Sequence, residues 1–204
     1  MGILREVFGP SKEELWSQLS QEIGAEYQKG GFFKSGKVVL SHRQWEITLD
    51  TYTVSTGKHS NTFTRIRAPY VNRDGFRFIV YRKSVFTGIG KLFGMQDIEI
   101  GDPYFDDEYV IQGAPDHMVH RLLANINIRH LIQKQPTIHF QVKDDEGWFG
   151  AKFPEGVDEL YFQAHGVIKD KARLKDLFDL FSAVLDELCR QGSAYEKEPG
   201  VQLT

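Results

Sequence analysis

The sequence predicts an α+β fold: a mainly antiparallel sheet with an N-terminal helix, an inserted helix pair and a long C-terminal helix packed on it. Segments with strand-like patterns are separated mostly by turns rather than by helices, which indicates antiparallel pairing. The alternating strand–helix pattern of parallel nucleotide-binding sheets is absent. The 204 residues are 41% hydrophobic and 26% charged, so we expect a single globular domain over residues 1–204 with a loose tail at 193–204.

Capping residues and apolar periodicity predict the helices. The capping box Ser11–Glu14 indicates that a first helix starts there, and we expect it to continue to Gly30. An apolar pattern that opens at Asp116 changes phase at residues 125–127, which predicts two short helices with a break between them. A wide apolar stripe predicts the final helix over residues 170–190.

One predicted strand changes its apolar parity along its length. Apolar and polar residues alternate over residues 44–49, which is the pattern of a half-buried strand. After Asp50 the apolar positions shift to Tyr52 and Val54. A β-bulge adds one residue to a strand and would account for this shift, so we expect one near Asp50–Thr51.

A hairpin is predicted from two β-rich segments, residues 62–71 and 76–82, which are joined by the turn 72–75. Pro69 lies in the first segment and cannot donate a backbone hydrogen bond to a neighbouring strand. We therefore expect this strand to lie at an edge or to contain a local break. Further strands are expected at residues 98–100, 109–112, 137–142 and 160–168.

Charge and cysteine content restrict the partners and the compartment. The net charge is −3, and because nucleic-acid binding depends on a positive excess, we expect no nucleic-acid partner. The single Cys189 cannot form an internal disulfide, which favours a reducing, cytoplasmic location. No apolar stretch is long enough for a transmembrane segment, and Arg5 and Glu6 interrupt any signal-peptide core.

The glycine-rich run at residues 88–94 does not match a nucleotide-binding motif. In a phosphate-binding loop, glycine and Ser or Thr would stand where this chain has Val85 and Leu92. In a dinucleotide-binding fingerprint, a glycine would replace Phe93. We interpret the run as a connection between strands and expect no bound cofactor.

The histidines do not form a recognisable metal or catalytic motif. His117 and His120 are three residues apart and share one helix face, but zinc needs three or four converging ligands. Cys189 is alone, and no nucleophile motif accompanies the histidines. We expect no metal site and no catalytic residue.

A basic strand face is the first candidate contact site. If the turn 72–75 makes a hairpin with an even-numbered loop, Arg65, Arg67 and Arg82 share one face. Such a face could bind an anion or an acidic partner. The alternative is an exposed face whose arginines are paired with cross-strand acids.

An acidic turn over residues 101–108 is the second candidate, with Asp102 and Asp106 as contact residues. Its carboxylates could bind a hard cation or act as acid and base. Residues 103–105 interrupt the alternating oxygen ligands of a calcium loop. The alternative is a solvated turn, because Gly101-Asp102-Pro103 has turn chemistry.

Trp148 is the third candidate, because it lies in an acidic, glycine-flanked loop. A large aromatic in such a loop is either an anchor folded onto the core or part of an exposed contact patch.

Several short elements spread over nearly the whole chain carry a family resemblance. They are the run at 91–98, Gly101-Asp102-Pro103 with Phe105-Asp106, residues 109–113, Trp148-Phe149-Gly150, residues 153–160 and Leu188-Cys189. Together they resemble an uncharacterised bacterial domain family of unknown function with a Gly-Asp-x-x-Phe-Asp element. The resemblance implies a compact bacterial cytosolic protein and brings no activity, cofactor or catalytic residue.

These observations lead to a non-enzymatic, cytosolic binding or protein-interaction module as the leading hypothesis. Its partner would be another protein or a second copy of the chain. The alternative is a small-ligand-binding or hydrolytic domain that uses the carboxylates of the 101–108 turn.

Overall fold

The computed structural model describes residues 10–31, 35–57, 59–85, 96–144, 153–201 and 203. These residues form an α+β fold with an antiparallel sheet and helices on one of its faces, as the sequence predicts. The strands are β1 (Glu26–Gln28), β2 (Lys37–His42), β3 (Trp45–Thr56), β4 (His59–Asn72), β5 (Arg77–Arg82), β6 (Tyr109–Ala114), β7 (His139–Lys143), β8 (Val157–His165) and β9 (Ala194–Tyr195).

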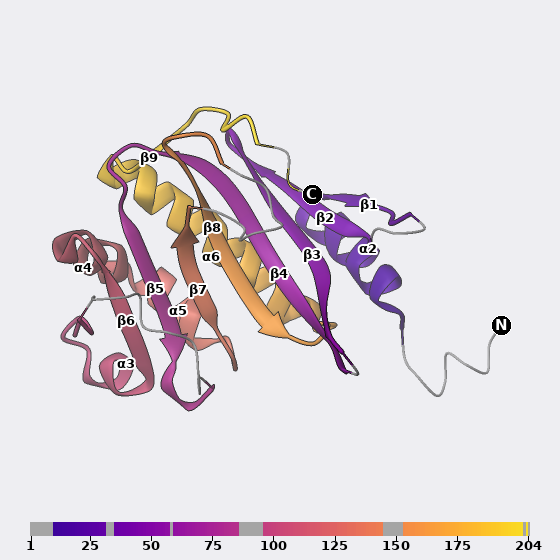
Figure 1. The fold of residues 1–204 in the computed structure, drawn as a ribbon, viewed down its shortest axis with the longest axis horizontal. Helices are drawn as coiled ribbons and strands as arrows, with labels where there is room; N and C mark the ends of the chain where they lie inside the picture. The colour runs from indigo at the N-terminus through magenta and orange to yellow at the C-terminus, as the bar shows by residue number, and fades with distance from the viewer. Residues whose placement is uncertain are drawn as a thin grey trace.

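The strands are ordered β1-β2-β3-β4-β8-β7-β5-β6, and β9 pairs with the end of β4. The helices are α2 (Lys12–Ile23), α3 (Pro103–Glu108), α4 (Asp116–Ala124), α5 (Ile126–Gln133) and α6 (Lys171–Gln191), with a 3-10 turn at Lys83–Val85. In Figure 1, α2, α5 and α6 lie behind the sheet, and none of the helices that the structure describes lies over the face toward the viewer.

The capping box of α2 is confirmed, but its predicted end is wrong. Ser11 accepts a hydrogen bond from the Glu14 N–H, and the Glu14 carboxylate accepts one from the Ser11 N–H. The helix ends at Ile23 because Gly24 adopts a left-handed conformation (φ 70°) and closes the C-terminus. The residues that follow form β1, where Tyr27 pairs with Val38.

The helix pair and the final helix are confirmed. Asn125 separates α4 from α5, and its side chain accepts hydrogen bonds from two backbone N–H groups at the start of α5. Asp170 caps the N-terminus of α6, and Gly192 (φ 87°) ends it. Each break therefore lies at a residue whose chemistry favours a cap.

The predicted bulge in β3 is wrong. Its pairing with β4 is uninterrupted from Thr48↔Arg67 to Thr56↔His59, with no extra residue at Asp50. The apolar parity changes because Tyr52 and Val54 face the helix-free side of the sheet, whereas the earlier apolar residues face the helices. Two different apolar environments lie on opposite faces of one regular strand.

The predicted hairpin between β4 and β5 is also wrong. Strands β8 and β7 lie between them, so the turn 72–75 crosses the end of the sheet instead of joining neighbours. Asn72 supports this crossing, since its amide donates to the Phe76 carbonyl (3.0 Å) and to Asp158 Oδ2 (2.5 Å). A turn-like sequence specifies a change of direction and not the partner of the next strand.

Pro69 lies in an interior strand, at the predicted local break. On one side of β4 the pairing with β3 ends at Arg67, and the pairing with β9 begins at Val71. Pro69 occupies the gap between these ladders while it faces Glu159 of β8 on the other side. The missing N–H of Pro69 is tolerated because β4 has no strand partner between Arg67 and Val71 on the side of β3 and β9.

Two further expectations differ from the structure. Residues 98–100 are not a strand, although the Ile98 N–H donates one hydrogen bond to the Ile111 carbonyl at 2.8 Å. The tail is not loose at its start, because Ser193 is fully buried and β9 pairs with β4.

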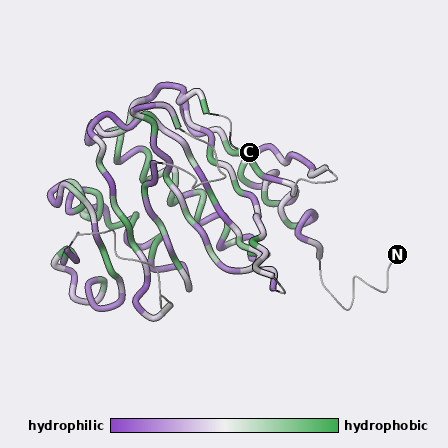
Figure 2. Tube along the Cα trace, in the orientation of Figure 1, coloured by the Kyte–Doolittle hydropathy of each residue, from purple (hydrophilic) through white to green (hydrophobic). Residues whose placement is uncertain are grey.

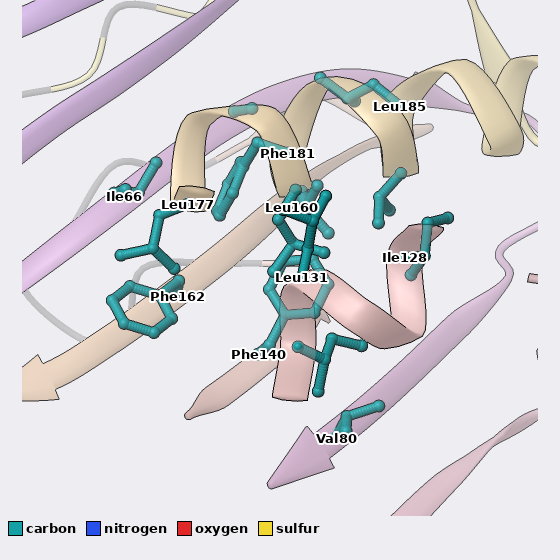
Figure 3. Packing of buried hydrophobic residues seen from close by; sticks show 14 of the residues in the cluster. Ile66, Val80, Ile128, Leu131, Phe140, Leu160, Phe162, Leu177, Phe181 and Leu185 are labelled. Atoms are coloured by element: carbon teal, nitrogen blue, oxygen red, sulfur yellow. The ribbon is translucent and has the colours of Figure 1, made fainter. Parts of the chain in front are cut away.

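The hydrophobic core lies between the sheet and the helices. Figure 3 shows Leu177 and Phe181 of α6 above Phe140 and Phe162 of the strands, with Leu131 of α5 beside them. The rings of Phe140 and Phe181 meet edge to face at 5.4 Å, a favoured aromatic geometry. Figure 2 shows apolar and polar residues alternating along the strands, which places the core on one face.

Gly113 should be sensitive to an added methyl group, because both a side chain and the backbone lie close to it. A Cβ at Gly113 would lie 2.6 Å from Val119 and 2.8 Å from the Arg77 carbonyl. We expect Gly113→Ala to lower the unfolding free energy by roughly 1–3 kcal/mol through overpacking. In the matched control Gly31→Ala, the new Cβ meets nothing within 4 Å. Urea unfolding of both variants tests this, and equal stabilities would contradict it.

Candidate functional site

The helix-free side of the central strands carries a set of polar residues that we call the polar face. Strand register places Asp50, Arg65 and Gln163 in one row across β3, β4 and β8. The next row contains Arg67 and Tyr161. The polar face comprises Asp50, Tyr52, Arg65, Arg67, His139, Gln141, Lys143, Glu159, Tyr161 and Gln163.

An ion cluster of one carboxylate and two guanidinium groups lies in the polar face. Asp50 accepts from Arg65 through both oxygens, at 2.6 Å to Nε and 3.2 Å to Nη2. Its Oδ2 also accepts from Arg67 Nη2 at 2.6 Å. Arg67 is only 1% exposed. Buried charges require such paired, hydrogen-bonded geometry, so the positions of these three side chains depend on one another.

Glu159 extends the charged part of the polar face. It is fully buried and its strand register places it between Pro69 of β4 and Lys143 of β7. Lys143 Nζ also lies 3.9 Å from the centre of the Tyr161 ring, in a cation–π contact. The face therefore contains acids and bases in alternation across four strands, β3, β4, β8 and β7.

A chain of neutral hydrogen bonds crosses the same surface. The Gln163 carbonyl accepts from Tyr52 Oη (2.8 Å) and Tyr161 Oη (2.9 Å). The Gln163 amide nitrogen donates to His139 Nδ1 at 3.2 Å, because an amide NH₂ has no acceptor capacity. His139 thus uses Nδ1 as an acceptor, which requires its ring to be neutral.

Burial sets the protonation states of His139 and Tyr161. Burial, and to a smaller extent the positive charge of Lys143, lower the pKa of His139 to about 4. Burial raises the pKa of Tyr161, and the neighbouring Tyr52 adds to this rise. Near pH 7 both groups therefore stay neutral.

An aromatic and apolar rim borders the polar face at the β3–β4 hairpin. Phe63 stacks on Tyr52 with ring centres 5.3 Å apart and meets His165 edge to face at 5.4 Å. Val54 is 43% exposed beside them. We call Val54, Phe63 and His165 the rim.

A groove of about 630 Å³ opens on the same side of the sheet, toward β2. Its volume is within the usual range of ligand sites. Its floor and wall are formed by the β2–β3 hairpin, Pro69 and the C-terminal segment. Its lining residues are Lys37, Ser41, Arg43, Gln44, Trp45, Glu46, Thr48, Pro69, Glu198, Pro199, Gly200, Val201 and Leu203.

The structure separates the three arginines that we expected on one face. Arg65 and Arg67 lie together, but Arg82 is on the helix-covered side of β5. Arg82 contacts Glu108 and donates to Tyr109 Oη at 2.6 Å. The expectation for Arg82 is wrong because β4 pairs with β8 and not with β5.

Asp102 and Asp106 have local structural contacts. Asp102 caps α3 by accepting from the Phe105 N–H at 3.2 Å, and it lies 3.5 Å from Arg129 Nε. Asp106 accepts from the Ile100 N–H (2.9 Å) and the Gly101 N–H (3.0 Å). Trp148, the third predicted contact residue, lies outside the described residues.

Sequence reasoning misses most of the polar face. It assigns Asp50 to a bulge and leaves His139, Tyr161 and Gln163 without a role. One signal in the sequence could have identified this face: β8 has polar side chains or tyrosine at every second position, namely Glu159, Tyr161 and Gln163. Only strand order shows that these positions face Arg65.

Metal ligands and membrane spans were also sought among the described residues. Within this part of the chain, no three His, Cys, Asp or Glu side chains are arranged to hold a metal ion. None of the helices that the structure describes is long and apolar enough to cross a membrane.

Comparisons with known proteins give one distant relationship of fold. No family model and no curated protein matches the sequence. Among solved structures, the mycobacterial trehalose monomycolate transport factor A, TtfA, is similar with a TM-score of 0.52 and 8% sequence identity. The match covers 94% of this chain and 98% of that chain. At this identity it shows that the two proteins share a fold.

Asp50 should be essential for stability. Asp50→Asn keeps the shape of the side chain but leaves Arg65 and Arg67 without this carboxylate. We expect a loss of roughly 3–5 kcal/mol in unfolding free energy. The control Asp179→Asn removes an exposed pair with Lys175 and should cost no more than about 0.5 kcal/mol. Chemical denaturation of both variants distinguishes the two, and a small effect at Asp50 would contradict the cluster's importance.

His139 should make the protein less stable in acid. Its pKa is about 4 in the folded state and near 6.5 in a model compound, so the unfolded chain binds the extra proton first. The neutral ring's contribution is complete above pH 6.5 and is lost as the pH falls toward 4.

The non-titrating variant His139→Gln should therefore lose less stability than the wild type between pH 7 and 4.5. The expected difference is on the order of 2 kcal/mol. Urea unfolding at both pH values measures it. Identical losses in the two proteins would show that His139 is not held neutral.

Proposed function

We propose that this protein is a non-enzymatic, cytosolic binding or protein-interaction module whose contact surface is the rim together with the half-buried residues of the polar face beside it, Tyr52, Arg65 and Gln163. One observation carries the proposal: the Asp50–Arg65–Arg67 cluster is organised on a sheet side that no described helix covers. Exposed sides of antiparallel sheets usually carry solvated, independent polar residues. Here the polar residues form a connected and largely buried arrangement.

Fold stability alone does not account for such a cluster. Replacing a buried ion group by apolar side chains of similar volume is often neutral or stabilising. A role in recognition would explain the cluster. Guanidinium groups held in one geometry can donate hydrogen bonds to a partner's acceptors, and little side-chain entropy is then lost on binding. Arg65 is suited to this role, since its side chain is 17% exposed while Asp50 holds it.

The rim supplies the apolar part of a contact surface. Tyr52 and Phe63 form a stacked pair, and Val54 extends the apolar area toward solvent. Protein interfaces are enriched in aromatic residues and arginine. An aromatic and apolar rim beside a guanidinium cluster therefore fits a protein partner.

The alternative, a ligand-binding or hydrolytic site at residues 101–108, has less support. The carboxylates of Asp102 and Asp106 accept hydrogen bonds from the backbone of their own turn. These contacts explain the acidic residues by local capping. The fold shared with a transport factor is compatible with a binding role for this chain.

An interaction through the rim should depend on Val54. Val54→Glu places a charge in the centre of the apolar rim and should abolish capture of a specific partner from a lysate of the native host. The matched control is Ile126→Glu at the start of α5, where the side chain is 72% exposed and away from the rim.

Affinity capture with quantitative mass spectrometry compares the wild type with both variants. A partner retained by the wild type and Ile126→Glu but lost by Val54→Glu supports the proposal. Equal retention by all three proteins would rule out the rim as the contact surface.

A further inference from the structure

A lysine, a serine and a threonine meet where the start of α2 approaches β3, on the side of the sheet opposite to the polar face. Lys12 Nζ donates to Ser35 Oγ at 2.5 Å and lies 3.4 Å from Thr51 Oγ1. The hydroxyl oxygens of Ser35 and Thr51 are 2.8 Å apart. The amine and the two hydroxyls therefore form one hydrogen-bonded group that includes neither the polar face nor the rim.

The serine and the lysine of this group differ in exposure. Ser35 is exposed, so a molecule from solvent can reach its hydroxyl. The Lys12 side chain is only 13% exposed, and its Nζ lies 4.7 Å from the centre of the ring of Trp16, which is fully buried. A shielded amine within hydrogen-bond distance of an accessible hydroxyl is the arrangement in which a lysine activates a serine nucleophile.

The surroundings of Lys12 favour its neutral form. Burial lowers the pKa of Lys12. The charged groups that act on it are Glu13 of its own helix, with a carboxylate oxygen 3.9 Å away, and Asp50 of β3; both raise the pKa, and burial outweighs them. At a given pH, Lys12 is therefore neutral more often than an exposed lysine. Only the neutral amine can take a proton from Ser35.

A phenol lies beside the residue that follows Ser35. Tyr27 of β1 approaches Gly36 so closely that a Cβ at Gly36 would lie 2.6 Å from Tyr27 Oη. This Oη is buried and has no hydrogen-bond partner within the described part of the chain. Burial, and then the charge of Glu13, raise the pKa of Tyr27, so the phenol keeps its proton. It is available to donate to an oxygen that gains negative charge near Ser35.

We propose that Ser35 is a site of covalent acylation, with Lys12 as its base and an activated acyl ester as the donor. The neutral Lys12 amine takes the proton of the Ser35 hydroxyl while Oγ forms a bond to the acyl carbon. The bond from that carbon to the leaving oxygen then breaks, and the leaving oxygen receives the proton from Lys12. The products are an ester on Ser35 and a free alcohol. This inference goes beyond the proposed interaction function and does not depend on it.

The test uses the full-length chain and p-nitrophenyl acetate, with peptide mass spectrometry to locate the acetyl group. The wild type should release nitrophenolate in a stoichiometric burst and carry acetyl on Ser35. Neutral hydroxylamine should remove this group, because it cleaves esters and leaves amides on lysines intact. Ser55 is the internal control, since it is also exposed but its hydroxyl lies 2.9 Å from that of Ser60 instead of a lysine amine. No acetyl on Ser35, or as much on Ser55, would overturn the inference.

Two variants test how Ser35 is activated. Lys12→Arg keeps a positive charge and a donor but cannot act as a base, so it should slow the acylation of Ser35 about a hundredfold. Tyr27→Phe removes the phenol hydroxyl and should slow acylation about tenfold. The wild-type rate should rise with pH and reach its plateau below the pKa of an exposed lysine, whereas Lys12→Arg should show no such plateau. Equal rates in the wild type and Lys12→Arg would contradict the inference.

The remaining controls separate reactivity from folding. Ser35→Ala changes an exposed residue and should abolish the burst without a change in stability. Urea unfolding verifies that Lys12→Arg and Tyr27→Phe are folded. Val54→Glu lies on the opposite side of β3 and should leave acylation unchanged while it abolishes partner capture, so the acylation site and the rim can fail independently.

Discussion

The alternation of side chains along β4 determines which residues fill the core and which build the polar face. Ile66 and Ala68 point toward the helices and are fully buried, whereas Arg65 and Arg67 point to the opposite side. Because β4 pairs with both β3 and β8, a shift of one residue in either register would move arginines into the core. This constraint links the hydrophobic packing to the position of every charge in the site.

The polar face carries an energetic cost that the core must offset. Buried charges lose their hydration, and their mutual attraction only partly compensates for it. The packing of α6 against Phe140 and Phe162 supplies apolar burial on the other side of the same strands. The strands thereby hold Asp50, Arg65 and Arg67 in one arrangement on the side opposite to α6.

Local signals in the sequence predict α2, α4, α5 and α6, whereas α3 forms where the sequence predicts a turn. The residues at Ser11, Asn125, Asp170 and Gly192 act within a few positions of themselves, and the structure uses each of them as a cap. The segments of β3 to β8 are also recognised, whereas β1, β2 and β9 are missed and the strand expected at residues 98–100 is not formed. The pairing of those strands is not recognised, because it depends on contacts between residues far apart in the chain. Arg82 is placed on the wrong face because β5 is assumed to pair with β4. Asp50 is assigned to a bulge because the change of apolar parity is assumed to need an extra residue.

The sequence by itself determined the α+β class, the antiparallel sheet, the N-terminal caps of α2 and α6 and the presence of arginines on β4. Period and capping are local properties, so one chain segment contains all the information that they need. Only the tertiary structure decided that Asp50 lies between Arg65 and Arg67, that Gln163 joins Tyr52 to His139, and that the C-terminal segment lines a groove. These contacts arise from strand order, which is selected by burial of the whole apolar face rather than by any single turn.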